Sequence, residues 1–170
     1  MAKRTRRVKA LPPSDYRALA EFRYQIRKFL HFSEQAARLA QLEPRQHQLL
    51  LALKGLPQGA RPRIGEVAER LQLQHHSTVE LANRLSARGY VRRHRDADDR
   101  REVLLSLTAR GEDTLRKLSL HHKAELQTAG PALMSALARV LGGSSNHRAL
   151  RLTQIANRWT APGGRASKRT

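Results

Sequence analysis

Apolar positions recur at helical spacing in two short neighbouring segments near the middle of the chain. They are Ile64, Val67, Ala68 and Leu71 in the first segment and Thr78, Leu81, Ala82 and Leu85 in the second. Spacings of three and four residues place such positions on one face of a helix. Only residues 72–74 separate the segments, which is room for a tight turn with Leu73 as an apolar plug. The pattern predicts a helix-turn-helix.

The second helix leaves a polar face away from the core, and its predicted end is Gly89, which can adopt a positive φ without strain. The residues that could reach DNA are Gln74, His75, His76, Ser77, Glu80, Asn83 and Arg84. Two starting points are open. A helix that begins at Ser77 would use Ser77 and Glu80 as a capping box on its own backbone. A helix that begins near Gln74 or His75 leaves both side chains free to reach DNA. Glu80 could then accept a hydrogen bond from cytosine, or it could provide specificity by repulsion.

A charged hairpin is predicted after this helix. Residues 91–95 and 102–107 are strand-like, and residues 96–101 form a charged turn between them. Arg95 ends the first strand, and Arg100 and Arg101 at the tip can enter a minor groove, where a narrow A·T tract concentrates negative potential. The alternative is a solvated turn whose acids and arginines neutralise one another.

Long helical patterns flank this segment, so the predicted fold is mainly α with a small β-hairpin wing. We expect a basic disordered tail at residues 1–13, an N-terminal dimerisation helix at 14–41 and a winged helix-turn-helix lobe at 42–108. C-terminal dimerisation helices are expected at 109–160, interrupted after residue 141, and a second basic tail at 161–170. Gly130 and Pro131 should kink the longer of these helices.

The composition favours a polyanionic partner and a reducing compartment. Lys and Arg number 33 against 14 Asp and Glu, giving a formal net charge of +19. The chain has no cysteine, which excludes a thiol switch and a zinc-thiolate site. No apolar run reaches the roughly 18 residues of a membrane span, and the N-terminus does not resemble a signal peptide, so we expect a cytoplasmic protein without a membrane partner. The basic tails either solubilise the chain or clamp phosphates nonspecifically.

Neither catalytic chemistry nor a metal site is predicted. The sequence contains no serine, histidine and acid arrangement, no glycine-rich phosphate loop and no paired-carboxylate signature, so we expect no enzyme activity and no cofactor. The eight histidines include two adjacent pairs, at 75–76 and 121–122, which point apart on a helix.

Four segments together resemble the MarR family of transcriptional regulators. They are LEPRQHQLL (42–50), EVAERL (66–71), NRLSARGYVRR (83–93) and DDRREVLLSLTARGE (98–112). The resemblance implies a winged helix-turn-helix, a second helix that begins near Gln74, and a wing in which Asp99 holds Arg101 extended. It also implies a homodimer in which the first and last helices of both subunits interleave.

The resemblance further implies a crevice for a small anionic or aromatic ligand between the dimerisation helices and the DNA-binding lobe. Residues that could line it are Arg23, Tyr24, Arg27, His31 and His47, with solvated helix surface as the alternative. We therefore expect a homodimeric repressor that binds a pseudo-palindromic operator in duplex DNA and is released by such a ligand. The alternative is a nonspecific or architectural nucleic-acid-binding protein, driven by its basic tails.

Overall fold

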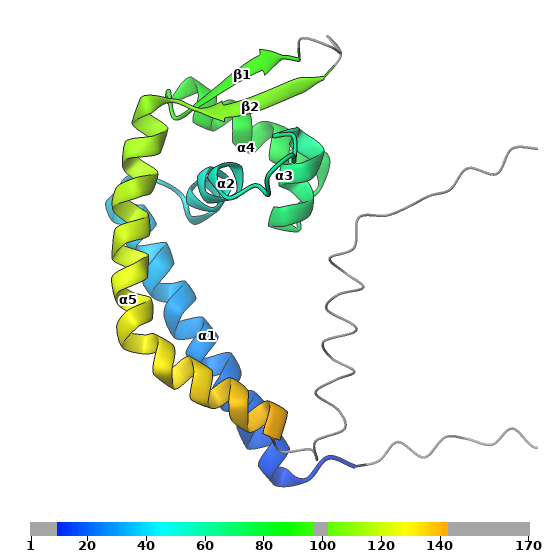
Figure 1. Ribbon diagram of the computed structural model, residues 1–170, viewed down its shortest axis with the longest axis vertical. Coiled ribbons are helices and arrows are strands. Elements are labelled where there is room, and N and C mark those ends of the chain that lie inside the picture. The colour runs from blue at the N-terminus through cyan, green and yellow to red at the C-terminus, as the bar shows by residue number, and fades with distance from the viewer. Residues whose placement is uncertain (1–9, 97–101, 143–170) are drawn as a thin grey trace, which may run out of the picture. The chain divides into compact units, whose positions relative to one another are not determined.

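The computed structural model describes residues 10–96 and 102–142 (Figure 1). The elements are α1 (Pro13–Leu39), α2 (Pro44–Lys54), α3 (Ile64–Leu71), α4 (His75–Ala87), β1 (Val91–Arg95), β2 (Val103–Leu107) and α5 (Ala109–Gly142). This is the mainly helical fold with a two-stranded wing that the sequence predicts. α1, α3, β1, β2 and α5 begin within one residue of the predicted positions, because apolar periodicity and turn residues mark these starts.

The chain divides into two compact units, residues 1–27 with 130–170 and residues 28–129. In the described part of the first unit, the start of α1 lies beside the end of α5, and Ala136 is fully buried there (Figure 1). The second unit holds the winged helix-turn-helix lobe with the adjoining parts of α1 and α5. α5 continues as a helix through Pro131.

A single hydrophobic cluster holds the second unit together, and Leu73 in the turn between α3 and α4 packs against it as predicted. The cluster comprises Ala37, Leu42, Leu49, Leu50, Leu53, Ile64, Val67, Leu81, Ala82, Leu85, Tyr90, Val91, Leu105, Leu115 and Leu118. It draws on α1, α2, α3, α4, both strands and α5. The faces of α3 and α4 that point away from this core are thus held in place by all the other elements of the unit.

The wing is a two-stranded antiparallel hairpin in which Val91 pairs with Leu107 and Arg95 with Val103. The N–H of Asp96 donates to the carbonyl of Glu102 at 3.1 Å, which closes the hairpin below its tip. The segment before α3 extends the sheet, because the Leu105 N–H donates to the Pro62 carbonyl at 2.9 Å.

The motif Leu-Thr-x-x-Gly joins the wing to α5. Thr108 Oγ1 lies 2.6 Å from the Gly89 carbonyl and accepts the N–H of Gly111 at 3.1 Å, which makes Thr108 the N-cap of α5. A Cβ on Gly111 would lie only 2.1 Å from the Tyr90 carbonyl oxygen, so only glycine fits at this crossing. These residues fix the end of α4 against the start of α5.

Several predictions fall on residues outside the described ranges. These are residues 1–9 of the N-terminal tail, the C-terminal tail, the part of the C-terminal helices expected after residue 142, and the wing-tip residues Asp99, Arg100 and Arg101. Within the described ranges, no helix has the length and apolar character that crossing a membrane requires.

Candidate nucleic-acid interface

The second helix of the helix-turn-helix begins at His75 and not at Ser77. Its N-cap is Gln74, whose backbone is extended at φ −68° and ψ 148°. Thr78 Oγ1 donates back to the Gln74 carbonyl at 3.2 Å. The alternative in which the helix begins at Ser77, with Ser77 and Glu80 as a capping box, is therefore wrong. The helix begins at His75, directly after the turn, and this start places Thr78 on the buried apolar face.

The first turns of α4 carry exposed polar side chains. Gln74, His75, His76, Glu80, Asn83 and Arg84 are exposed, and Ser77 is half-buried. Glu80 and Arg84 have no hydrogen-bond or ion-pair partner among the described residues. Their polar groups are free to meet a ligand across the surface of the lobe.

Asn83 is connected to the wing. Arg93 Nη1 on β1 donates to Asn83 Oδ1, which leaves the Asn83 amide N–H groups for another acceptor. The sequence does not single out Arg93, because no local signal distinguishes it from the neighbouring basic residues of β1. The pairing fixes the first strand of the wing to the polar face of α4.

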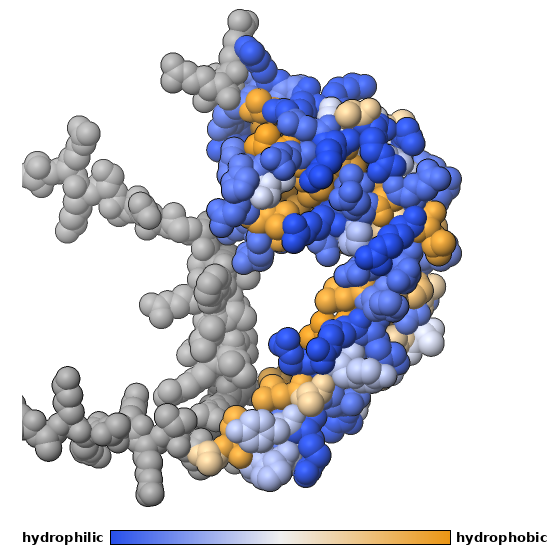
Figure 2. Space-filling view, turned by 180° about the vertical axis from the view of Figure 1, so that it is seen from behind, coloured by the Kyte–Doolittle hydropathy of each residue, from blue (hydrophilic) through white to orange (hydrophobic). Residues whose placement is uncertain are grey.

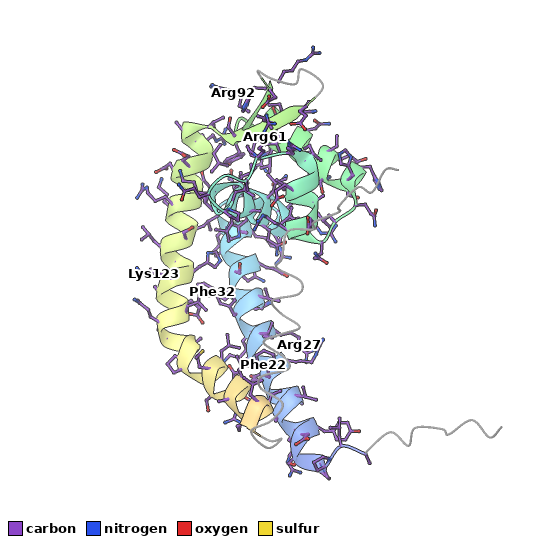
Figure 3. All side chains as sticks on the ribbon, turned by 45° about the vertical axis from the view of Figure 1, so that its right-hand side comes forward. Phe22, Arg27, Phe32, Arg61, Arg92 and Lys123 are labelled. Carbon is purple, nitrogen blue, oxygen red and sulfur yellow. The ribbon has the colours of Figure 1, made fainter. Side chains whose placement is uncertain are left out.

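The first strand of the wing is basic over almost its whole length. Arg92, Arg93, His94 and Arg95 are all exposed, and only Val91 is buried. Arg92 projects from the strand (Figure 3), and Arg61 contacts the residues just before and just after the tip of the hairpin. A basic strand beside a polar helix face is the arrangement that contacts both phosphates and base edges in duplex DNA.

The end of α4 is connected to α2 and to the turn that follows α1. The N–H of Gly89, at φ 72°, bonds the Ser86 carbonyl at 2.9 Å, which gives the predicted glycine stop. The Arg88 side chain does not turn back to the open carbonyls at the end of α4, although it lies beside them in the sequence. Its guanidinium donates instead to the Gln41 carbonyl after α1 at 2.7 Å and to Gln46 Oε1 on α2 at 3.0 Å.

Tyr90 completes this connection. Its buried ring lies between two guanidinium groups, 5.3 Å from that of Arg88 and 4.4 Å from that of Arg110 on α5. Arg110 also donates to the Arg88 carbonyl at 3.0 Å. The orientation of α4 is thus coupled to α2, to α5 and to the turn after α1.

A second site lies between α1, α2 and α5 within the same unit. It is a cavity of about 430 Å³ lined by Phe29, His47, Leu51, Ser119, His122, Lys123, Leu126 and Gln127. The His47 and His122 rings stack 4.8 Å apart, almost parallel at 6°, with the edges of Phe29 and Phe32 against His122. Figure 3 shows Phe32 on α1 and Lys123 on the facing helix α5.

Both histidines are buried and retain an unpaired ring nitrogen. His122 Nδ1 lies 2.6 Å from the Leu118 carbonyl, so this nitrogen carries the hydrogen. The Nε2 atoms of His47 and His122 have no partner among the described residues. Burial, with a smaller effect of the neighbouring His122, lowers the pKa of His47 to about 4, so that His47 is neutral at pH 7.

Of the residues expected to line a ligand crevice, His47 lines this cavity. His31 lies exposed on α1 and is not among the lining residues. Arg23, Tyr24 and Arg27 are exposed on the part of α1 that belongs to the other compact unit. The described residues contain no group of three or more His, Asp and Glu side chains suited to hold a metal ion.

Large apolar side chains are exposed along the long helices, where Figure 2 shows hydrophobic patches. They are Tyr16, Leu19, Tyr24, Leu30 and Leu39 on α1 and Leu120, Leu126, Met134 and Leu141 on α5. The most exposed, Leu39, has 87% of its surface accessible. Apolar surface on this scale is typical of a region that another chain covers.

Comparison with known proteins supports the same fold. Residues 40–102 match the model of the MarR family. AbsC, a MarR family transcriptional regulator from Streptomyces coelicolor, is 20% identical with a TM-score of 0.63, over 89% of this chain and 98% of AbsC. MepR, a transcription regulator of the Staphylococcus aureus multidrug efflux pump MepA, is 17% identical with a TM-score of 0.58, over 85% of this chain and 95% of MepR.

A mutant of S. aureus MepR bound to an oligodeoxyribonucleotide is also similar, at 17% identity and a TM-score of 0.56, over 85% of this chain and 94% of that one. No curated protein matches the chain in sequence. The family model and the solved structures confirm the resemblance to the MarR family and its winged helix fold.

Proposed function

We propose that this MarR-family winged helix-turn-helix protein is a homodimeric transcriptional regulator, a repressor that binds a defined operator in duplex DNA. The observation that carries the proposal is the polar face of α4 beside the basic strand β1. Glu80 and Arg84 are exposed without partners among the described residues, and Arg92 and Arg95 are exposed on the neighbouring strand. α4 supplies the base contacts and β1 supplies the phosphate contacts.

The dimer accounts for the exposed apolar side chains of α1 and α5. Two copies related by a two-fold axis would cover these side chains and present two α4 helices to one face of the duplex. The operator is then a pseudo-palindrome with half-sites about 10 base pairs apart, centre to centre.

Selection of bound sequences from a random DNA pool tests the DNA-binding function, with footprinting of the winning sequence. The expected result is one pseudo-palindromic site protected over both halves. Selection without enrichment would favour the alternative function, a nonspecific or architectural protein. A single half-site bound by a monomer would exclude the homodimer and retain sequence specificity.

The cavity beside His47 is our proposed site for an effector that releases the operator. Its lining is aromatic and aliphatic on α1 and α2, so it suits the ring of a small aromatic molecule, and Lys123 can meet an acidic group. A ligand releases DNA only by its stronger affinity for the state that cannot bind the operator. A coupling of about 1 to 3 kcal/mol is sufficient.

Titration of aromatic carboxylates into a preformed complex with labelled operator tests this site. We expect release by at least one compound at millimolar concentration, and loss of that release in Leu51→Trp, which fills the cavity from an exposed position. His31→Ala is the control, because His31 lies on α1 but does not line the cavity, and this variant should respond as the wild type does. Equal responses in both variants would refute the cavity assignment. The same titration of Arg23→Ala and Arg27→Ala tests the earlier expectation for the first half of α1.

A further inference from the structure

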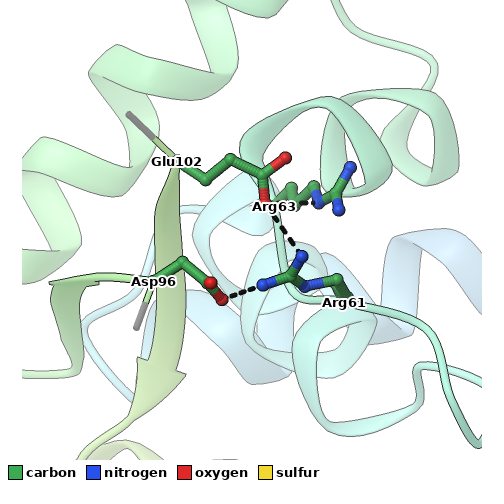
Figure 4. A network of polar contacts seen from close by, with 4 residues as sticks. All are labelled: Arg61, Arg63, Asp96 and Glu102. Carbon is green, nitrogen blue, oxygen red and sulfur yellow. Dashed lines mark hydrogen bonds and ion pairs between the residues drawn. The ribbon is translucent and has the colours of Figure 1, made fainter. Parts of the chain in front are cut away.

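Arg61, which precedes the helix-turn-helix, joins the two arms of the wing (Figure 4). Its guanidinium forms an ion pair with Asp96, the residue after β1. Arg61 Nη1 also lies 3.4 Å from Glu102 Oε2, just before β2, and Arg63 Nε lies 3.0 Å from the same oxygen. One side chain therefore contacts the carboxylates on both sides of residues 97–101.

The burial of these groups shows that the arrangement is specific. The Asp96 side chain is only 8% exposed, and that of Glu102 is 24% exposed. A carboxylate in such a position needs a cation beside it, because an unpaired buried charge is strongly unfavourable. Asp96 is therefore held by its ion pair with Arg61, and Glu102 by Arg61 and Arg63 together, next to the tip of the hairpin.

The backbone around Arg61 is equally well fixed. Arg63 pairs with Leu104 in an isolated antiparallel bridge, and the Pro62 carbonyl accepts the Leu105 N–H. This short edge runs directly into α3, which begins at Ile64. Arg61 thus connects a rigid part of the helix-turn-helix to both ends of the wing tip.

We propose that Arg61 is a positioning residue for DNA binding, which sets the spacing and direction of the two wing arms through Asp96 and Glu102. The proposal rests on the proposed function, because it assumes that the wing contacts DNA. A direct phosphate contact by Arg61 is disfavoured, since two carboxylates already neutralise its guanidinium. Its effect on binding therefore passes through the wing.

Arg61→Met tests the proposal, because methionine keeps an apolar stem and removes the charge. Arg70→Met is the matched control, since Arg70 pairs with Glu66 at 2.9 Å on α3, away from the wing. Binding of the selected operator is measured for each by fluorescence anisotropy over a salt series, alone and combined with Arg101→Ala. Thermal melting verifies that each variant is folded.

Arg61→Met should weaken operator binding about tenfold, and Arg70→Met by less than about twofold. The salt dependence of Arg61→Met should match the wild type, whereas loss of a phosphate contact would lower the slope by about 0.9. In the Arg101→Ala background the additional loss should fall below about twofold, because the wing contact is already absent. A merely structural role for Arg61 would leave its effect unchanged in that background.

A reduced salt slope, or additive effects of Arg61→Met and Arg101→Ala, would overturn the positioning role. If Arg61→Met does not fold, Arg61→Lys and Asp96→Asn take its place in the same cycle, with the same expected coupling. Failure of the proposed function is recognised separately, because the wild type itself would then show no preference for the selected operator; that result also overturns the role of Arg61.

Discussion

Substitution of Gly111 by alanine should destabilise the protein strongly, although alanine is the better helix former. The new Cβ would lie 2.1 Å from the Tyr90 carbonyl oxygen, whereas ordinary contact begins at 3.4 Å, so the start of α5 must move away from Tyr90 by about 1.3 Å. Overpacking of this kind costs about 1 to 3 kcal/mol. The Thr108 N–H, which donates to the same oxygen at 3.1 Å, loses part of a bond worth about 1 kcal/mol.

The helical preference of alanine returns about 1 kcal/mol, which leaves a net loss of about 1 to 3 kcal/mol. For a chain of this length the midpoint of thermal unfolding should fall by about 3 to 10 °C, measured by circular dichroism. Gly130→Ala is the control in the same helix, because no atom lies within 4 Å of its added Cβ. Its midpoint should stay level or rise. A Gly111→Ala midpoint within 1 °C of the wild type would refute the steric reasoning.

Four further predictions concern pH, the wing, the recognition helix and the dimer. The unfolded chain protonates His47 below about pH 6.5 and the folded chain only below about pH 4, so the free energy of unfolding should fall by about 3 kcal/mol as the pH drops through that window. Urea titrations should show this slope reduced in His47→Phe, and equal slopes would contradict the burial argument. Arg101→Ala should weaken operator binding by about 1 to 3 kcal/mol with unchanged melting, and Asp99→Ala should also weaken it; tighter binding by Asp99→Ala would mean that charge repulsion outweighs the orienting role. Glu80→Ala should change which bases a random pool yields in each half-site, and an identical consensus would exclude Glu80 from base readout. Met134→Glu, at a side chain that is 67% exposed, should shift the mass measured by light scattering from dimer towards monomer, and an unchanged mass would place the dimer interface elsewhere.

The helices and strands could be predicted because local signals mark them. The apolar positions of α3 and α4 recur at threes and fours, and Gly89 supplies the positive φ that ends α4. Thr108 caps α5 through its own neighbour Gly111, only three residues away. Each of these interactions lies within about one turn of the chain, where sequence spacing determines which residues meet.

The partners of the charged side chains could not be predicted, since they come from distant segments. Arg61 meets Asp96 across 35 positions, and Arg88 reaches the Gln41 carbonyl across 47. Which arginine meets which carboxylate depends on how the segment before α3 lies along β2. The spacing of apolar residues in the sequence does not determine this placement. No local pattern distinguishes Arg61 from the rest of the 33 Lys and Arg residues.

In the cavity beside α5, too, the local feature could be predicted and the long-range contact could not. His122 falls on the apolar seam of α5 by spacing, and its burial agrees with that position. Its stacking on His47 depends on the packing of α2 against α5, which only the structure shows. The spacing of His122 among apolar residues predicts that its side chain is buried, but it does not predict which residue the ring contacts.

The ratio of affinities for the selected operator and for random duplex DNA of equal length, at physiological salt, tests the central claim most directly. A regulator that reads bases through α4 and the wing should prefer the operator by about 10³ or more. Basic tails and phosphate contacts alone bind any duplex. A ratio near one would contradict sequence-specific regulation and favour the architectural protein.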